Sequence, residues 1–129
     1  SRTPPSEKVL AERLQYITMK GNETFKVAVR TLEEIARSTL SANHLRVEDI
    51  DLYVPHQANI RILKAVMERL GLPIEKVMLN VERYGNTSAA SIPIALDEAV
   101  REGRIKDGSL VMLGAFGAGL TWASAVIRW

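Results

Sequence analysis

Short apolar segments with the character of β-strands alternate with longer segments of helical periodicity along most of this chain. The strand-like segments are residues 14–19, 50–54, 77–81, 110–116 and 120–129. Apolar residues recur at helical spacing over approximately residues 24–40, 57–70 and 88–102. Strands separated by helices indicate an α/β fold with a mostly parallel sheet. The sequence therefore predicts the order β-α-β-α-β-α-β-β and a five-stranded sheet.

The two ends of this pattern differ from its middle. The last two strands are joined by residues 117–119, a turn short enough for antiparallel pairing, so we expect an antiparallel last strand. Residues 1–13 are polar and contain Pro4 and Pro5, which is typical of an N-terminal arm or linker. The segment at 88–102 is apolar around most of its circumference, which predicts a helix buried on more than one side.

The composition excludes several classes of function. The 129 residues contain no cysteine, so disulfides, thiolate metal sites and a cysteine nucleophile are excluded within this chain. A net charge of only +2 does not indicate a nucleic-acid-binding protein. No apolar run approaches the roughly 18 residues of a membrane span, and the polar N-terminal residues lack a signal-peptide core. We therefore expect a cytoplasmic protein with neither membrane nor nucleic acid as a partner. We also predict no metal site and no bound cofactor.

Four turns are expected at one edge of the predicted sheet. In open α/β sheets, sites lie beyond the carboxyl ends of the parallel strands, where successive turns come together. The turns that follow the first four strands are residues 21–22, 55–57, 84–86 and 117–119. Topology alone thus brings His56 and Asn86 towards the glycine-containing turn. This convergence predicts a site more strongly than any single motif does.

His56 and Asn86 each allow a functional and a structural interpretation. At a strand–helix junction the positive helix end disfavours a second positive charge, so His56 should be neutral near neutral pH and able to donate one hydrogen bond. Taken alone, however, a histidine at a strand end and an asparagine in a turn more often serve the backbone. Residues 117–119 would either present N–H groups to an oxyanion or simply close a hairpin.

Five blocks of the sequence resemble the β-ketoacyl-acyl carrier protein synthase III family. They are residues 21–29, 54–62, 84–93, 95–99 and 114–122. The blocks occur in the family's order and at its spacing, and the resemblance extends over roughly residues 14–129. The most specific are residues 55–59 and 85–91, which read PHQAN and GNTSAAS.

This resemblance implies the thiolase fold, in which two similar halves stack as α-β-α-β-α layers. The predicted strand order matches one half, and the motifs identify it as the second, so residues 14–129 would form a complete C-terminal thiolase-like half-domain. In the family the third helix of each half lies between the two sheets. In an isolated half, the inner face of that helix, with Ile92, Leu96 and Val100, would be exposed and would be expected to find a partner.

The resemblance also implies an activity and a set of site residues. The family condenses acyl-CoA with malonyl-acyl carrier protein to 3-oxoacyl-acyl carrier protein in fatty acid synthesis, and a cysteine of the first half carries the acyl group. His56 and Asn86 would hydrogen-bond the malonyl thioester oxygen during decarboxylation. The other matches are Gly21, Asn22, Phe25, Ala58 and Asn59 in the CoA or pantetheine tunnel, Lys26 and Arg61 at the carrier-protein surface, and Phe116, Gly117 and Ala118 in the active-site and oxyanion loop.

Two positions depart from the family pattern. Ala118 stands where glycine is common, and alanine fits there if its φ is negative, because only the backbone N–H is required. Glu68 lies on a predicted helix surface that is commonly more basic in the family, which weakens the expected attraction of an acidic carrier protein there.

Without a cysteine, this chain is not expected to run the condensation alone. We expect it to combine with a cysteine-containing N-terminal half, as the second part of a complete synthase that acts with acyl carrier protein. The alternative is an isolated or engineered half-domain that self-associates as a structural module without catalysis, with a second copy replacing the first half. A third interpretation is slow decarboxylation of malonyl thioesters by His56 and Asn86 alone.

Overall fold

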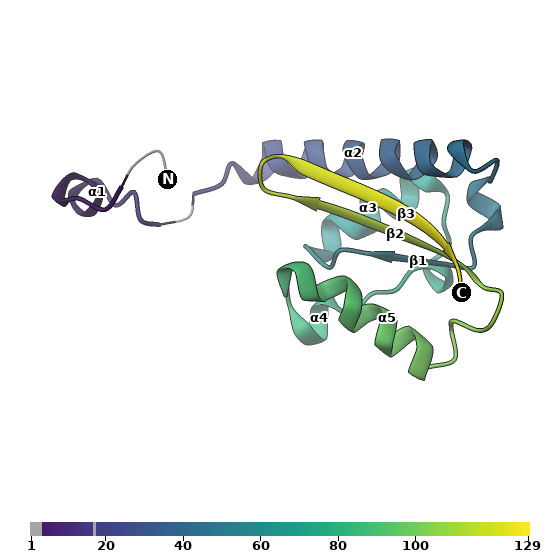
Figure 1. Ribbon diagram of the computed structural model, residues 1–129. Coiled ribbons are helices and arrows are strands. Elements are labelled where there is room, and N and C mark those ends of the chain that lie inside the picture. Colours follow the sequence, from purple (N-terminus) through teal and green to yellow (C-terminus); the bar gives the residue numbers. More distant parts are fainter. Residues whose placement is uncertain (1–3, 17) are drawn as a thin grey trace.

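Helices cover a small β-sheet, and an N-terminal arm extends away from them (Figure 1). The computed structural model describes residues 4–16 and 18–129. Its α-helices are α1 (Glu7–Ala11), α2 (Gly21–Ala42), α3 (Ile60–Leu70), α4 (Val81–Tyr84) and α5 (Ser91–Arg101). Its strands are β1 (Leu52–Pro55), β2 (Leu110–Gly117) and β3 (Thr121–Arg128). Single 3₁₀ turns are η1 (Val47–Asp49), η2 (Ile74–Lys76) and η3 (Ser88–Ala90).

The strands form one sheet in the order β1-β2-β3. β1 runs parallel to β2, with Leu52 opposite Val111, and β2 runs antiparallel to β3, with Leu113 opposite Ala125. This mixed sheet with its helices confirms the α/β class and the antiparallel last strand. The prediction of a five-stranded sheet was wrong, because the structure has a three-stranded sheet in its described residues.

Residues 77–81, predicted as a strand, pair with the sheet at one point only. That point is an isolated parallel bridge between Tyr53 and Val77. Beyond the bridge, the backbone N–H groups of Asn80 and Val81 donate to a side chain and not to a neighbouring strand. A ladder needs successive backbone partners, so the apolar run does not continue as a strand and α4 begins at Val81.

Residues 14–16 and 18–19, also predicted as a strand, lie outside the sheet; Ile17 falls outside the described residues. Leu14 and Tyr16 donate their N–H groups to carbonyls within the same arm, and their side chains are 51% and 59% exposed. Alternating apolar residues specify a strand only where one face is buried. The arm instead contains the short helix α1, capped by the Ser6 hydroxyl, which accepts from Val9 N.

The ends of α3 follow from two capping residues. The side chain of Asn59 accepts a hydrogen bond from Arg61 N at 2.8 Å, so the helix begins at Ile60 and not at Gln57 as predicted. Gly71, at a φ of 71°, ends the helix in the left-handed conformation that glycine adopts without steric cost. The predicted stop at Gly71 is confirmed.

Helices α2 and α3 cover one face of the sheet, and α5 covers the other (Figure 1). The main buried cluster on the α2–α3 face contains Val29, Leu32, Ala36, Leu40, Ile50, Tyr53, Val66, Met67, Leu70, Leu72, Val77 and Met112. The cluster on the α5 face contains Leu52, Val54, Met78, Ala95, Ala99, Ile105 and Val111. Within residues 4–16 and 18–129, no helix has both the length and the apolar character needed to cross a membrane.

The α5 face of the sheet is only partly covered. Ile92 and Leu96 are partly buried against it, whereas Val100 is 40% exposed. The register puts Ala125 and Ile127 of β3 on this same face, and both are exposed. The predicted burial of the third helix on several sides is therefore not met within the described residues, and an open apolar surface remains. We call this surface, formed by Ile92, Leu96, Val100, Ala125 and Ile127, the open face.

Gly114 of β2 is required by the ring of Tyr53, which crosses over it. A Cβ at position 114 would meet the Tyr53 hydroxyl oxygen in direct overlap and lie 3.1 Å from Cε2. The Tyr53 hydroxyl is buried and has no hydrogen-bond partner among residues 4–16 and 18–129, and burial raises the pKa of Tyr53. The close approach of a strand and an aromatic ring thus fixes glycine at this position.

We predict that Gly114→Ala lowers the free energy of unfolding by about 2 kcal/mol, because the added methyl group overpacks the contact. Adding Tyr53→Phe should restore part of this loss, since it removes the nearest atom. Tyr53→Phe alone should cost little. Urea denaturation followed by circular dichroism measures all three variants. Equal losses from Gly114→Ala in the Tyr53 and Phe backgrounds would contradict the assignment.

The side-chain amide of Gln57 joins the turn after β1 to the segment before α4. Its NH2 group donates to Pro55 O at 2.9 Å and to Met78 O at 3.0 Å. Its oxygen accepts from Asn80 N at 2.9 Å and from Val81 N at 3.1 Å. Gln57 is fully buried, at 0% exposure, and two donors and two acceptor positions are all in use. One side chain therefore holds two turns together.

We predict that Gln57→Met lowers the free energy of unfolding by about 3 kcal/mol or more. Methionine has a similar length, but it leaves several buried backbone N–H and C=O groups without partners. Lys64→Met on the exposed side of α3 is the matched control and should change stability by less than about 0.5 kcal/mol. If the two variants unfold at the same urea concentration, the Gln57 side chain does not make the predicted contribution to the free energy of unfolding.

Candidate active site

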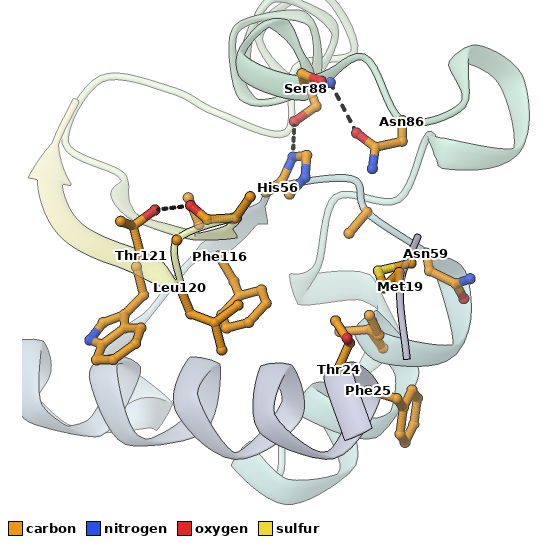
Figure 2. A pocket seen from close by; sticks show the side chains of 18 of the residues that line it. Met19, Thr24, Phe25, His56, Asn59, Asn86, Ser88, Phe116, Leu120 and Thr121 are labelled. Atoms are coloured by element: carbon orange, nitrogen blue, oxygen red, sulfur yellow. Dashed lines mark hydrogen bonds between the residues drawn. The ribbon is translucent and has the colours of Figure 1, made fainter. Parts of the chain in front are cut away.

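A pocket of about 1120 Å³ opens at the carboxyl ends of β1 and β2. Its walls come from the start of α2, the β1–α3 turn, the segment between α4 and α5, and the β2–β3 hairpin (Figure 2). All four turns that the sequence predicted at this edge contribute residues to it. Residues 21–22 do so as the first residues of α2, not as a turn after a strand.

The pocket brings together most of the residues that the family resemblance implicated. Those that line it are Gly21, Asn22, Phe25, His56, Ala58, Asn59, Arg61, Asn86, Phe116, Gly117 and Ala118. Lys26 is exposed on α2 and does not line it. In the described part of the chain, no group of three or more His, Asp or Glu side chains is placed to hold a metal ion. The predicted convergence is confirmed, whereas the role of each residue stays a prediction.

His56 is the half-buried residue that follows β1. Its backbone N–H donates to Gly114 O at 2.7 Å, which continues the pairing of β1 with β2, and its Nδ1 lies 2.6 Å from the Ser91 hydroxyl oxygen. Partial burial removes water from the ring and lowers the pKa of His56, so the neutral form is favoured near neutral pH. The sequence predicted the neutral form from the helix end, but α3 begins only at Ile60, and burial is the cause.

Asn86 serves its turn and also offers a donor to the pocket. Its Oδ1 accepts from Ser88 N at 3.0 Å, a local turn that holds the oxygen on the protein side (Figure 2). Its NH2 group donates to no described residue, although Asn86 lines the pocket. The structural and the functional interpretations are therefore compatible, since each uses a different atom of the amide.

Glu98 of α5 fixes the segment that leads to Asn86. Its carboxylate accepts from Asn80 Nδ2 at 2.8 Å and from the Tyr84 hydroxyl at 2.9 Å. The guanidinium of Arg83 lies 2.7 Å from the same carboxylate. The residue just before α4 and the last two residues of α4 are thus bound to one acidic side chain, which anchors the turn that begins immediately afterwards.

The hairpin between β2 and β3 forms the opposite wall. The hydroxyl of Thr121 donates to Ala118 O at 3.2 Å, and Gly119 has a φ of 143° (Figure 2). Ala118 is not among the described non-glycine residues with positive φ, so its methyl group is accommodated without strain. The turn interpretation of residues 117–119 is confirmed, and their use as an oxyanion site stays a prediction.

Arg61 and Phe25 lie together at the α2–α3 side of the pocket. The guanidinium carbon of Arg61 is 5.8 Å from the centre of the Phe25 ring, within the range of a cation–π contact. Asn59, predicted as a tunnel residue, also caps α3. This wall combines one fixed positive charge with an aromatic surface.

Three residues that organise the site were not singled out from the sequence: Gln57, Ser91 and Glu98. They act through hydrogen bonds to residues distant in the chain, as in the 34 to 35 residues that separate Ser91 from Gln57 and His56. Such contacts leave no periodic pattern. The available signal was their position inside the blocks at 54–62, 84–93 and 95–99.

The chain is similar in sequence to a known family and to several of its members. A family model described as 3-oxoacyl-[acyl-carrier-protein] synthase III C terminal matches residues 40–129. The β-ketoacyl-[acyl-carrier-protein] synthase III of Alkalilimnicola ehrlichii is 60% identical over 114 residues, which cover 88% of this chain and 35% of that protein. The synthase III of Aquifex aeolicus is 51% identical over 119 residues, which cover 92% of this chain and 38% of that protein.

Solved structures agree with the sequence relatives. The crystal structure of the Aquifex aeolicus synthase III superposes with a TM-score of 0.87 at 53% identity, over 88% of this chain and 37% of that chain. The Thermus thermophilus enzyme gives 0.85 at 57% identity, over 87% and 35%. This chain thus spans well under half the length of the relatives it matches. From its motif blocks, its α/β fold and these similarities, the chain belongs to the β-ketoacyl-[acyl-carrier-protein] synthase III family, with its match in the C-terminal domain.

Proposed function

We propose that this chain supplies the malonyl-handling part of the active site of a fatty-acid condensing enzyme. The observation that carries this proposal is the placement of His56 and Asn86 on one pocket, each with its protein-side atom already bound, by Ser91 and by Ser88 N respectively. The remaining ring nitrogen and the amide NH2 are then available to one substrate oxygen. Family membership supplies the reaction class.

In the proposed reaction, the bond between the malonyl carboxylate and the α-carbon breaks, and carbon dioxide leaves. The electron pair of that bond moves towards the thioester carbonyl, whose oxygen becomes negative. N–H donors from His56 and Asn86 stabilise this oxygen more in the transition state than in the ground state. The carbanion then attacks an acyl-cysteine thioester, and the cysteine thiolate leaves. That cysteine comes from another segment, because this chain has none.

The remaining pocket residues fit the binding of a thioester arm. Gly21 and Asn22 at the start of α2 and Ala58 and Asn59 after β1 line the pocket with small or polar surface, and Phe25 adds an apolar wall. We propose that they contact CoA or pantetheine. Phe116, Gly117 and Ala118 would close the reactive end, with their backbone near the acyl-cysteine.

Positive charge near the pocket fits a carrier-protein partner. Arg61 lines the pocket, and Lys26 lies exposed on the neighbouring α2. An acidic acyl carrier protein would be attracted to these side chains in a salt-dependent manner. The alternative position for this contact, the α3 surface, also carries Glu68, which weakens it. We propose a cytoplasmic setting for the assembled enzyme, as expected for a reaction between soluble thioesters.

The open face supports a partner of matching apolar character. Val100 and Ile127 are exposed there, and contiguous apolar surfaces of this kind usually bind another surface. We propose that a cysteine-containing N-terminal segment covers the open face. A second copy of this chain is the other candidate, favoured by the same exposure, and would give a structural module without condensation.

We predict that His56→Ala and Asn86→Ala each slow malonyl-CoA decarboxylation about 100-fold, the usual loss for one oxyanion donor. The assay combines this chain with the N-terminal part of the Alkalilimnicola ehrlichii synthase, which is expected to carry the family's cysteine, and follows carbon dioxide release. Lys64→Ala on the exposed side of α3 is the control and should leave the rate unchanged. Unchanged rates with both site variants would contradict the proposal. If this chain alone also releases carbon dioxide, and the two variants slow that release, decarboxylation occurs without the cysteine.

We also predict that the open face forms the interface. Mixing the chain, of 14.3 kDa, with the N-terminal part should give a one-to-one complex by light scattering. Val100→Asp should weaken that complex at least about tenfold, since it buries a charge in an apolar contact, while Lys64→Asp should not. A complex indifferent to Val100→Asp would contradict the interface. A dimer of the chain alone, lost in the same variant, would favour the self-associating alternative.

A further inference from the structure

We propose that Ser91 holds His56 in the neutral tautomer that carries its proton on Nε2. Ser91 is therefore a positioning residue, which acts on the substrate only through the imidazole. The assignment of the tautomer follows from hydrogen-bond geometry in the chain itself. Its consequence for the chemistry rests on the proposed function.

The Ser91 hydroxyl lies between two consecutive residues of the β1–α3 turn. Its oxygen is 2.6 Å from His56 Nδ1 and 3.3 Å from Gln57 N. Ser91 is the first residue of α5 and is only 2% exposed, so water does not compete freely for its hydroxyl. In Figure 2 the dashed line that ends on the ring of His56 is this bond to the Ser91 hydroxyl, and Ser91 itself is not labelled.

Counting protons assigns the donors. The Gln57 backbone N–H can only donate, so the Ser91 oxygen accepts from it. The single hydroxyl proton of Ser91 then has one recorded acceptor among the described residues, which is Nδ1 of His56. Nδ1 can accept only if it carries no proton. The ring proton of neutral His56 is therefore on Nε2.

The opposite tautomer leaves a buried group unsatisfied. With a proton on Nδ1, the Ser91 oxygen would accept from both His56 and Gln57, and its own O–H would have no acceptor among the described residues. Buried hydroxyl groups without partners are unfavourable, so the Nε2–H form is selected.

This selection decides what the pocket offers to a substrate. With the proton on Nε2, His56 is a donor on the side away from Ser91, and the amide NH2 of Asn86 is a second donor on the same pocket. With the other tautomer, an Nε2 lone pair would face any oxygen that Asn86 binds, and would repel it as negative charge develops. Ser91 thus converts an ambiguous ring into a donor without touching the substrate.

The tautomer can be read directly by nitrogen-15 NMR of the imidazole. The chain has two histidines, so His44→Asn leaves His56 as the only imidazole. His44 is exposed and has a φ of 56°, which asparagine tolerates. At pH 8, well above the usual histidine pKa of about 6.5, the ring is neutral. We expect a proton on Nε2 only, and an Nδ1 resonance typical of a hydrogen-bonded acceptor.

Two variants test whether Ser91 causes this state. Ser91→Ala should shift the Nδ1 resonance to that of a free acceptor and allow the Nδ1–H form to appear. Ser91→Thr keeps the hydroxyl and should restore the wild-type spectrum. A proton on Nδ1 in the otherwise wild-type ring, or identical nitrogen spectra with and without Ser91→Ala, would overturn the proposal. A proton on Nδ1 can be detected with Ser91 in place. The proposal can therefore be contradicted even if Ser91→Ala fails to fold.

The decarboxylation assay separates this inference from the proposed function. We expect Ser91→Ala to slow carbon dioxide release about tenfold in the His56 protein and to have no further effect in His56→Ala, because it acts through the ring. Equal slowing in both backgrounds would contradict a role through His56. If the NMR tautomer is as predicted but no variant at His56 affects the rate, the proposed function fails while the tautomer assignment stands.

Discussion

The buried amide of Gln57 is the contact on which the geometry of the pocket depends. It binds backbone groups of the turn that carries His56 and of the segment that leads to Asn86. Since both donors and both acceptor positions are used inside the protein, neither turn can shift without leaving a buried polar group unpaired. The same bonds take the N–H groups of Asn80 and Val81 that a further strand would have used. The geometry of the pocket and the absence of a strand beyond Val77 thus have one physical cause.

Helix α5 completes this arrangement, because it holds both turns from the other side. Ser91 at its start binds the ring of His56. Glu98, two turns further on, binds Asn80 before α4 and Tyr84 at the end of α4, in the segment that precedes Asn86. Ala95 and Ala99 of the same helix are fully buried, so the helix backbone approaches the sheet closely. The polar and the apolar side chains of α5 therefore have different roles. The polar side chains orient the proposed donors, and the apolar side chains pack α5 against the sheet.

Much of this could be predicted from the sequence, and the failures have a common reason. Periodicity located the three long helices and the three strands of the described part of the chain. Helices α2, α3 and α5 and strands β1 and β2 bury apolar residues within the chain, whereas β3 is held by its pairing with β2 and leaves Ala125 and Ile127 exposed. Periodicity failed at residues 14–19 and 77–81, since an apolar pattern reports side-chain burial and not whether a backbone ladder is available. Convergence of the turns was predictable because parallel strands end at one edge. The hydrogen bonds of Gln57, Ser91 and Glu98 were not, because they join distant residues whose spacing carries no signal.

The open face and the pocket adjoin each other on the α5 side of the sheet. The register puts Ala115 and Ala123 on the α5 side of the sheet, and both, with Ile92, also line the pocket. A partner that covers the open face would therefore also narrow the pocket and remove water from around His56. Electrostatic stabilisation of a developing oxyanion is stronger where water is excluded. Under the proposed function, assembly would then do more than bring a cysteine to the substrate, because it would also strengthen the hydrogen bonds that His56 and Asn86 offer.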